Sequence, residues 1–121
     1  MIRRLSEIAH ARSGDKGAGA NIGVIAYTRE GFELIRQKLT AEAVEKFFKP
    51  MRPGKVTRYE LPNLLALNFV LSEILDGGGS VSLRIDAQGK ALGQVILQMP
   101  IEMSDDQFER CRRRDDQARL T

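Results

Sequence analysis

The hydrophobic pattern of this 121-residue chain switches repeatedly between the alternation typical of strands and the wider spacing typical of helices. Residues 21–27 are β-branched and apolar, as expected of a buried strand. Strand patterns also occupy residues 3–10, 55–61, 80–86 and 91–99, with a turn joining the last two. We therefore expect a sheet of short strands whose last two members form an antiparallel hairpin.

Helical patterns fill the intervals between these strands. Residues 30–39 and 41–49 place apolar side chains at helical spacing, and Thr40 can cap the second of these helices. Pro62 fits the first turn of a longer helix, in which leucine and valine side chains occupy most of the circumference and predict burial. Ser104 can cap a short polar helix near the C-terminus, which has too few apolar anchors to predict tight docking.

The order of these elements predicts an α+β protein, a two-layer sandwich with helices on one face of a mixed β-sheet. The length suits one domain with a core of its own, and hydrophobic and charged fractions of 42% and 29% are those of an ordinary globular protein. We assign residues 1–103 to this domain and residues 104–121 to a charged C-terminal helix and tail.

The composition excludes several classes of protein. One histidine and one cysteine cannot form a structural zinc site or an internal disulfide, so we expect no metal and no cofactor. No apolar run is long enough to span a membrane, and the basic start of the chain is not followed by the apolar segment of a signal peptide. We expect a cytoplasmic protein without a membrane partner.

The net charge of +3 does not form a binding patch for polyanions. Residues 104–121 carry five arginines and five acidic residues, so the excess charge is spread over the rest of the chain. The basic run at 112–114 is flanked by acids and contains no aromatic residue for base stacking. Nucleic-acid binding through the arginines of 110–114 is therefore the weakest of three functional hypotheses.

The stretch that could carry chemistry is a glycine-rich segment between two predicted strands. It begins at the only histidine, His10, and we interpret residues 12–20 as a loop. Glycines let backbone N–H groups approach a ligand, and a nearby arginine and lysine add positive charge, so the segment could hold a carboxylate or phosphate. The candidate ligand-binding residues here are Arg12, Ser13, Gly14, Asp15, Lys16, Gly17 and Asn21.

Two catalytic candidates lie in the same segment, His10 and Asp15. An unperturbed pKa of about 6.5 makes His10 the best proton carrier at neutral pH, although a structural histidine is the commoner case. Together with Ser13 these residues could be read as a nucleophilic triad, but triad residues converge from distant segments and this serine lacks a nucleophile elbow. The simpler interpretation is that Ser13 and Asp15 hydrogen-bond within their own loop.

Two asparagines extend the candidate site. We place Asn63 in the first turn of the predicted buried helix, where amides commonly cap, and Asn68 within that helix. A buried amide without a partner costs roughly 1–3 kcal/mol, so a bond to neighbouring backbone is the commoner explanation. The alternative is that one of them meets the glycine-rich segment and lines a pocket.

Three blocks resemble a known family. The segment from His10 to Gly17, followed by residues 21–26, is similar to the C-terminal domain of AtuA-type acyclic terpene utilisation proteins, and so are residues 58–71 and 82–90. The resemblance covers about residues 5–100. It implies a ferredoxin-like sandwich, and the family is associated with the breakdown of acyclic terpenes and branched acyl-CoA compounds.

The resemblance implies a standalone form of a domain that follows a larger region in the full family proteins. The leading hypothesis is an accessory or subunit domain that forms a homo-oligomer or assembles with a larger AtuA-like subunit. The second hypothesis is a small enzyme or binding module for an acyl-CoA or carboxylate, in which the segment from residue 10 to residue 21 holds the anion.

Overall fold

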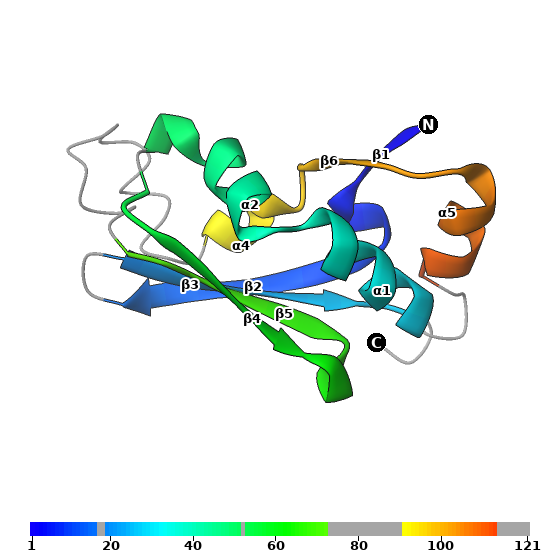
Figure 1. Cartoon of the computed structure of the whole chain (residues 1–121), viewed down its shortest axis with the longest axis horizontal. Coiled ribbons are helices and arrows are strands. Elements are labelled where there is room, and N and C mark those ends of the chain that lie inside the picture. Colours follow the sequence, from blue (N-terminus) through cyan, green and yellow to red (C-terminus); the bar gives the residue numbers. More distant parts are fainter. Residues whose placement is uncertain (17–18, 52, 73–90, 114–121) are drawn as a thin grey trace.

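The computed structural model describes residues 1–16, 19–51, 53–72 and 91–113. Its centre is a four-stranded sheet in the order β2-β3-β5-β4, formed by β2 (Ala9–Lys16), β3 (Gly19–Ala26), β4 (Val56–Leu61) and β5 (Ala66–Leu71). All three pairings in this sheet are antiparallel. Figure 1 shows the sheet below a layer of helices. The predicted α+β two-layer architecture, with helices on one face, is confirmed.

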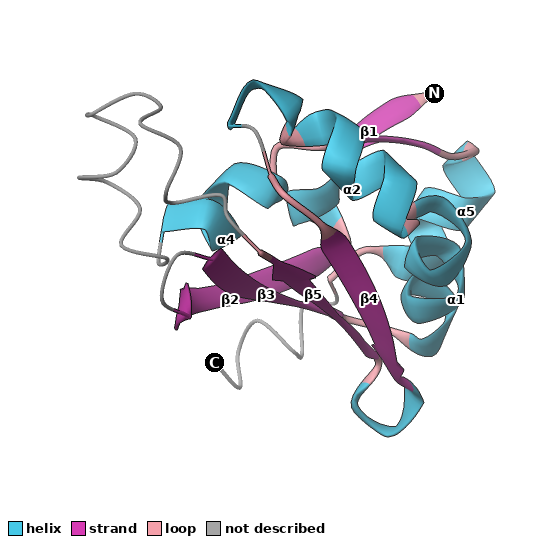
Figure 2. Ribbon diagram, turned by 60° about the vertical axis from the view of Figure 1, so that its left-hand side comes forward, coloured by secondary structure: helices cyan, strands magenta, loops and turns pink. Residues whose placement is uncertain are grey.

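Three helices cover one face of the sheet, namely α1 (Arg29–Lys38), α2 (Ala41–Phe47) and α4 (Ala91–Ile96). Figure 2 shows them together on the same side of the strands. The core between the layers includes Ile22, Val24, Leu67 and Phe69 of the sheet, none of which is exposed. We call this the covered face and the opposite side the open face, because no described helix packs on it.

The helix caps at Thr40 and Ser104 follow the sequence prediction. The hydroxyl of Thr40 accepts a hydrogen bond from the N–H of Ala43, so α2 begins where expected, and a 3₁₀ turn, η2 (Lys49–Met51), follows it. Thr28 caps α1 in the same way. Near the C-terminus, Ser104 caps α5 (Asp105–Cys111).

The α5 helix docks more firmly than its composition suggests. The side chain of Cys111 is only 2% exposed, and the Thr28 hydroxyl donates a hydrogen bond to the carbonyl of Arg110. The guanidinium of Arg3 also lies 3.8 Å from the centre of the Phe108 ring. These contacts attach α5 to α1 and to the N-terminal strand.

The prediction of a long helix starting at Pro62 is wrong. The chain forms only a 3₁₀ turn, η3 (Pro62–Leu64), and then enters β5 through Leu65, whose φ of 54° is left-handed. This conformation is rare for a leucine and ends the turn by reversing the chain. The apolar run belongs to an inner strand with β3 on one side and β4 on the other, and short apolar runs do not distinguish such a strand from a helix.

The prediction that residues 12–20 form a loop is also wrong, because most of this segment belongs to a hairpin of β2 and β3. The pairing continues from Ala9 opposite Ala26 to Lys16 opposite Gly19. Glycine at position 19 is needed for packing, since a Cβ there would collide with the carbonyl oxygen of Leu71. Gly19 therefore allows close approach within a sheet and does not mark a long loop.

The first and the last of the predicted strands, residues 3–10 and 91–99, differ from expectation. Residues 3–10 divide into β1 (Ile2–Arg4), a 3₁₀ turn η1 (Leu5–Glu7) and the start of β2, because the turn buries Leu5 and Ile8 together. Residues 91–99, predicted as a strand, begin as α4, which buries Leu92 and Ile96 at helical spacing. The short β6 (Pro100–Glu102) then pairs with β1. The predicted strand at 80–86 and its turn lie outside the described residues.

No helix in the described part of the chain combines the length and the apolar character needed to cross a bilayer.

Candidate functional site

The open face presents an ordered array of side chains, because alternate residues of a strand point to opposite sides of the sheet. The register aligns Arg12, Gly23, Asn68 and Tyr59 in one row across four strands. The flanking rows are His10, Ile25, Ala66 and Leu61 on one side, and Gly14, Asn21, Val70 and Thr57 on the other. A groove of about 560 Å³ runs over this array.

The β2 side of the groove is cationic. Arg12 is exposed on the open face, and His10 stacks on the ring of Tyr27 with 5.5 Å between ring centroids and 9° between ring planes. Partial burial lowers the pKa of His10, and the positive charges of Arg12 and Arg113 lower it further. The imidazole therefore favours its neutral form, and the lasting charge at this end is that of arginine.

Two amides connect the central strands of the array. The side-chain nitrogen of Asn21 on β3 donates a hydrogen bond of 2.8 Å to the side-chain oxygen of Asn68 on β5. Each amide thereby fixes the orientation of the other, with the second polar atom of each directed elsewhere. The partner of the Asn68 side chain is therefore 47 residues away in the chain, and not the neighbouring backbone that the sequence favoured.

The β4 side of the open face is apolar and exposed. Tyr59, Leu61 and Leu64 have exposed fractions of 53%, 41% and 64%. We call these three residues the edge patch, because β4 is an outer strand of the sheet and η3 follows it directly. The sequence prediction missed this patch, since it assigned Leu64 to a buried helix.

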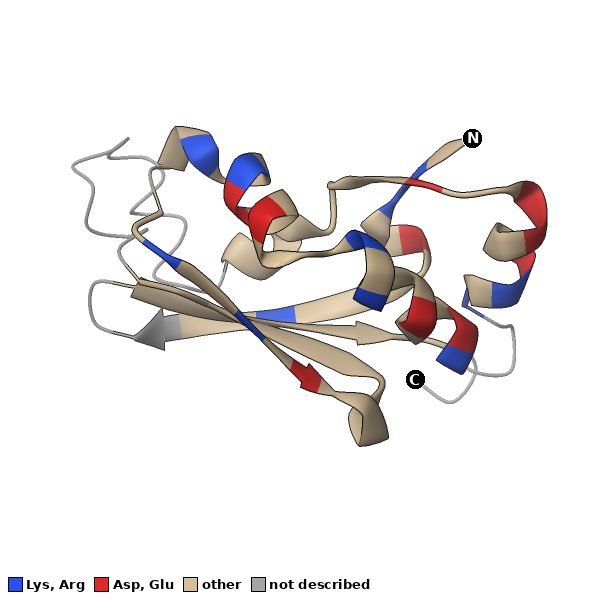
Figure 3. Ribbon diagram, in the orientation of Figure 1, with Lys and Arg blue, Asp and Glu red and all other residues tan. Residues whose placement is uncertain are grey.

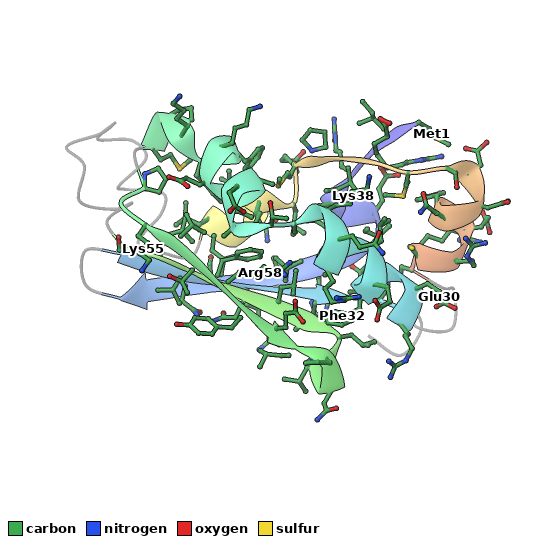
Figure 4. The ribbon with its side chains drawn as sticks, viewed as in Figure 1. Met1, Glu30, Phe32, Lys38, Lys55 and Arg58 are labelled. Carbon is green, nitrogen blue, oxygen red and sulfur yellow. The ribbon has the colours of Figure 1, made fainter. Side chains whose placement is uncertain are left out.

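Arg58 holds β4 in the orientation that exposes the edge patch. Its guanidinium donates to the carbonyls of Arg36 and Leu39 at the end of α1, at 2.8 and 3.1 Å, and pairs with Glu60 at 2.9 Å. Figure 4 shows Arg58 on the helix side of the sheet. Because Arg58 faces the helices, its neighbour Tyr59 must face the open side.

A comparison with protein families matches this architecture. A family model described as the AtuA ferredoxin-like domain covers residues 3–102, which include the whole sheet and the groove. The chain belongs to this family. No curated protein and no solved structure matches it. The AtuA-related ferredoxin-like fold expected from the sequence is thereby confirmed.

The AtuA-like domain brings five of the sequence-predicted residues to the groove at positions of the open face. These are His10, Arg12, Gly14, Asn21 and Asn68. Asn63 lies in η3 and is exposed, so it does not cap the helix we predicted. Asp15 and Lys16 end β2, but their side chains, like Gly17, lie outside the described residues.

Ser13 lies on the wrong side of the sheet for a triad with His10. Its hydroxyl oxygen accepts a hydrogen bond of 2.8 Å from the N–H of Gly93 in α4, on the covered face. Odd and even positions of β2 face opposite sides, so the strand separates Ser13 from His10. The Ser13 hydroxyl thereby connects the sheet to a helix of the covered face.

The charges of this AtuA-like domain lie mainly away from the groove. Figure 3 shows acidic and basic residues concentrated on α1, α2 and α5, with few on the strands. Among the described residues, histidine, cysteine and acidic side chains do not gather in groups that could hold a metal ion. From the open face, the described lining of the groove offers one guanidinium, one imidazole and two amides, and Ser13 also borders the groove.

Proposed function

We propose that this AtuA-like domain is an accessory or subunit domain in the catabolism of acyclic terpenes or branched acyl-CoA compounds, and that it assembles through its open sheet face. The observation that carries the proposal is the edge patch. Three large apolar side chains at neighbouring positions remain 41–64% exposed, and contiguous apolar surface commonly marks an interface.

A second copy of the chain is the partner that the charge distribution favours. The cationic groups of the open face lie on β2, whereas the edge patch on β4 and η3 is uncharged. A two-fold axis through the edge patch brings apolar side chains together and keeps the two Arg12 residues apart. Arg58 and Glu60 do not oppose this contact, because they are paired on the other face.

Molar-mass measurement by light scattering tests the assembly. The wild-type chain should have twice the mass of a 13.5 kDa protomer, and Leu61→Lys with Leu64→Lys should reduce it to one protomer. Ile2→Lys is the matched control, because Ile2 is 67% exposed but lies on β1, outside the sheet. A wild-type monomer at high concentration would refute self-association.

A larger AtuA-like subunit is the other candidate partner and forms a second arm of this experiment. Mixing such a subunit with the wild type and the double variant would show whether it needs the edge patch. Binding of that subunit by a monomeric chain would replace the second copy as partner. Absence of both interactions would contradict the assembly proposal altogether.

The catabolic role is tested separately by deleting the gene and measuring growth on an acyclic terpene and on a branched carboxylic acid. We expect selective loss of growth on these carbon sources. Restoration by the wild type and by Ile2→Lys, but not by the edge-patch variant, would connect growth to assembly. Normal growth of the deletion strain would contradict the role.

A further inference from the structure

We infer that the β2–β3 half of the groove binds a small aliphatic monocarboxylate, with the carboxylate over Gly23, beside Arg12 and the Asn21–Asn68 amide pair. The site does not depend on the proposed assembly. It lies on the side of the array away from the edge patch, so a partner docked on β4 leaves its charged end in place.

The first argument is a positive charge that lacks a described counterion. The ion pairs found among the described residues involve other arginines, and Arg12 is exposed within the groove. A guanidinium presents a planar fork of donors that matches a carboxylate in two parallel hydrogen bonds. An incoming carboxylate would supply the missing negative charge.

The second argument is the bare floor beside Arg12. A Cβ at Gly14 would meet no atom within 4 Å, and a Cβ at Gly23 would meet nothing closer than 3.9 Å. Neither glycine has a positive φ, so neither packing nor backbone conformation requires glycine there. Glycine within a strand otherwise marks a place where a ligand or another backbone approaches closely.

The third argument is the preorganised amide pair. The hydrogen bond between Asn21 and Asn68 joins the two central strands. Gly23 lies beside this bond because the register pairs Gly23 on β3 with Asn68 on β5. In this pair the amide nitrogen of Asn68 keeps its two N–H donors for a further acceptor. The register places Gly23 between Arg12 and Asn68, so a carboxylate over Gly23 would lie between the guanidinium and this amide.

The remaining lining selects the class of anion. Ile25, Ala66 and Leu61 continue the groove from the polar groups toward the η3 turn, so the body of the ligand meets apolar surface. Burial and the nearby arginines favour neutral imidazole at His10, so Arg12 carries the full positive charge among the described side chains of the array. Its planar fork of donors next to an apolar trough suits a carboxylate that carries an aliphatic chain.

Titration of the ¹⁵N-labelled full chain with sodium hexanoate tests the inference. Saturable NMR shifts should appear at the side-chain amides of Asn21 and Asn68 and at the backbone of Gly23. The neutral analogue 1-hexanol should bind at least about tenfold more weakly, because a hydrogen bond to a charged group contributes about 1.5–3 kcal/mol. Inorganic phosphate should also bind at least about tenfold more weakly, because it has no aliphatic chain to bury against the apolar trough. Equal binding of either compound would overturn the assignment to a carboxylate.

Three variants locate the site. Arg12→Gln should raise the dissociation constant of hexanoate about tenfold or more, and Gly23→Val should abolish the shifts by filling the floor. Arg29→Gln is the matched control, because Arg29 is an exposed arginine on α1. Circular dichroism confirms folding of each variant. Unsaturable shifts in the wild type, or unchanged affinity of Arg12→Gln, would refute the site.

Discussion

On the covered face of the sheet, Ile22, Leu67 and Phe69 are shielded completely from solvent. On the open face, their sequence neighbours are Gly23 and Asn68, and Tyr59 of β4 lies in the same row, so this face combines a bare backbone, an amide and an exposed ring. Both sets belong to the same sheet and differ in the direction of their side chains. The covered face accounts for the stability of the fold, and the open face is therefore free to carry binding.

The largest expected difference between the faces is in stability. Phe69→Ala leaves a cavity beneath the helices and should lower the free energy of unfolding by about 3–5 kcal/mol. Tyr59→Ala, on the open face and 53% exposed, should lower it by about 1 kcal/mol or less. Urea unfolding followed by circular dichroism measures both values. Similar losses for the two variants would mean that the open face is packed as tightly as the covered one.

The glycines of β3 give a sharper comparison on one strand. Gly19→Ala places a Cβ against the carbonyl oxygen of Leu71 and should cost about 1–3 kcal/mol of overpacking. Gly23→Ala has free space and should change the free energy of unfolding by about 0.5 kcal/mol or less. Thermal unfolding of the two alanine variants under identical conditions decides the matter. A strong effect at Gly23 would remove the argument that its floor is kept bare for a ligand.

The amide pair is the polar contact that joins the two central strands on the open face. Asn21→Ala and Asn68→Ala should each lower the free energy of unfolding by about 0.5–1.5 kcal/mol. The double variant should lose less than the sum, because either substitution removes the same hydrogen bond. A double-mutant cycle from urea unfolding measures this coupling. Additive losses would show that the two amides do not interact in solution.

How much of the fold could be predicted from the sequence depended on how far apart in the chain the interacting residues lie. Local signals were sufficient for α1, α2 and α5, because the capping hydroxyls of Thr40 and Ser104 act within one helical turn. They were misleading at β5, where leucine and valine fit a buried helix as well as an inner strand. Only pairing with β3 and β4 decides between these, and that pairing depends on residues distant in sequence.

The candidate site was predictable in its residues but not in its geometry. The sequence pointed to His10, Arg12, Asn21 and Asn68, and the sheet places all four on one face. It could not separate Ser13 from His10, because that requires the stretch to be a strand instead of a loop. Nor could it find the edge patch, since the exposure of Leu64 follows from the short η3 turn.

On the electropositive side of the open face, His10 should make the stability of the protein depend on pH. The pKa of His10 is lowered by burial and by Arg12 and Arg113, so the unfolded chain, with a pKa of about 6.5, binds the proton more tightly than the native state. The contribution of His10 to stability should therefore fall as the pH drops from about 6.5 toward its native pKa, with no effect above that window. His10→Gln should lack this slope.

NMR titration of the imidazole measures the native pKa directly. It should lie below the value of an unfolded peptide, and Arg12→Gln should raise it because one of the two positive neighbours is lost. Arg29→Gln, on the opposite layer, should leave it unchanged. Bound hexanoate should also raise this pKa, because its carboxylate offsets the charge of Arg12. An unshifted pKa in the free protein would mean that the β2 side of the groove is solvated like ordinary surface, and the contrast between the two halves of the open face would then rest on the edge patch alone.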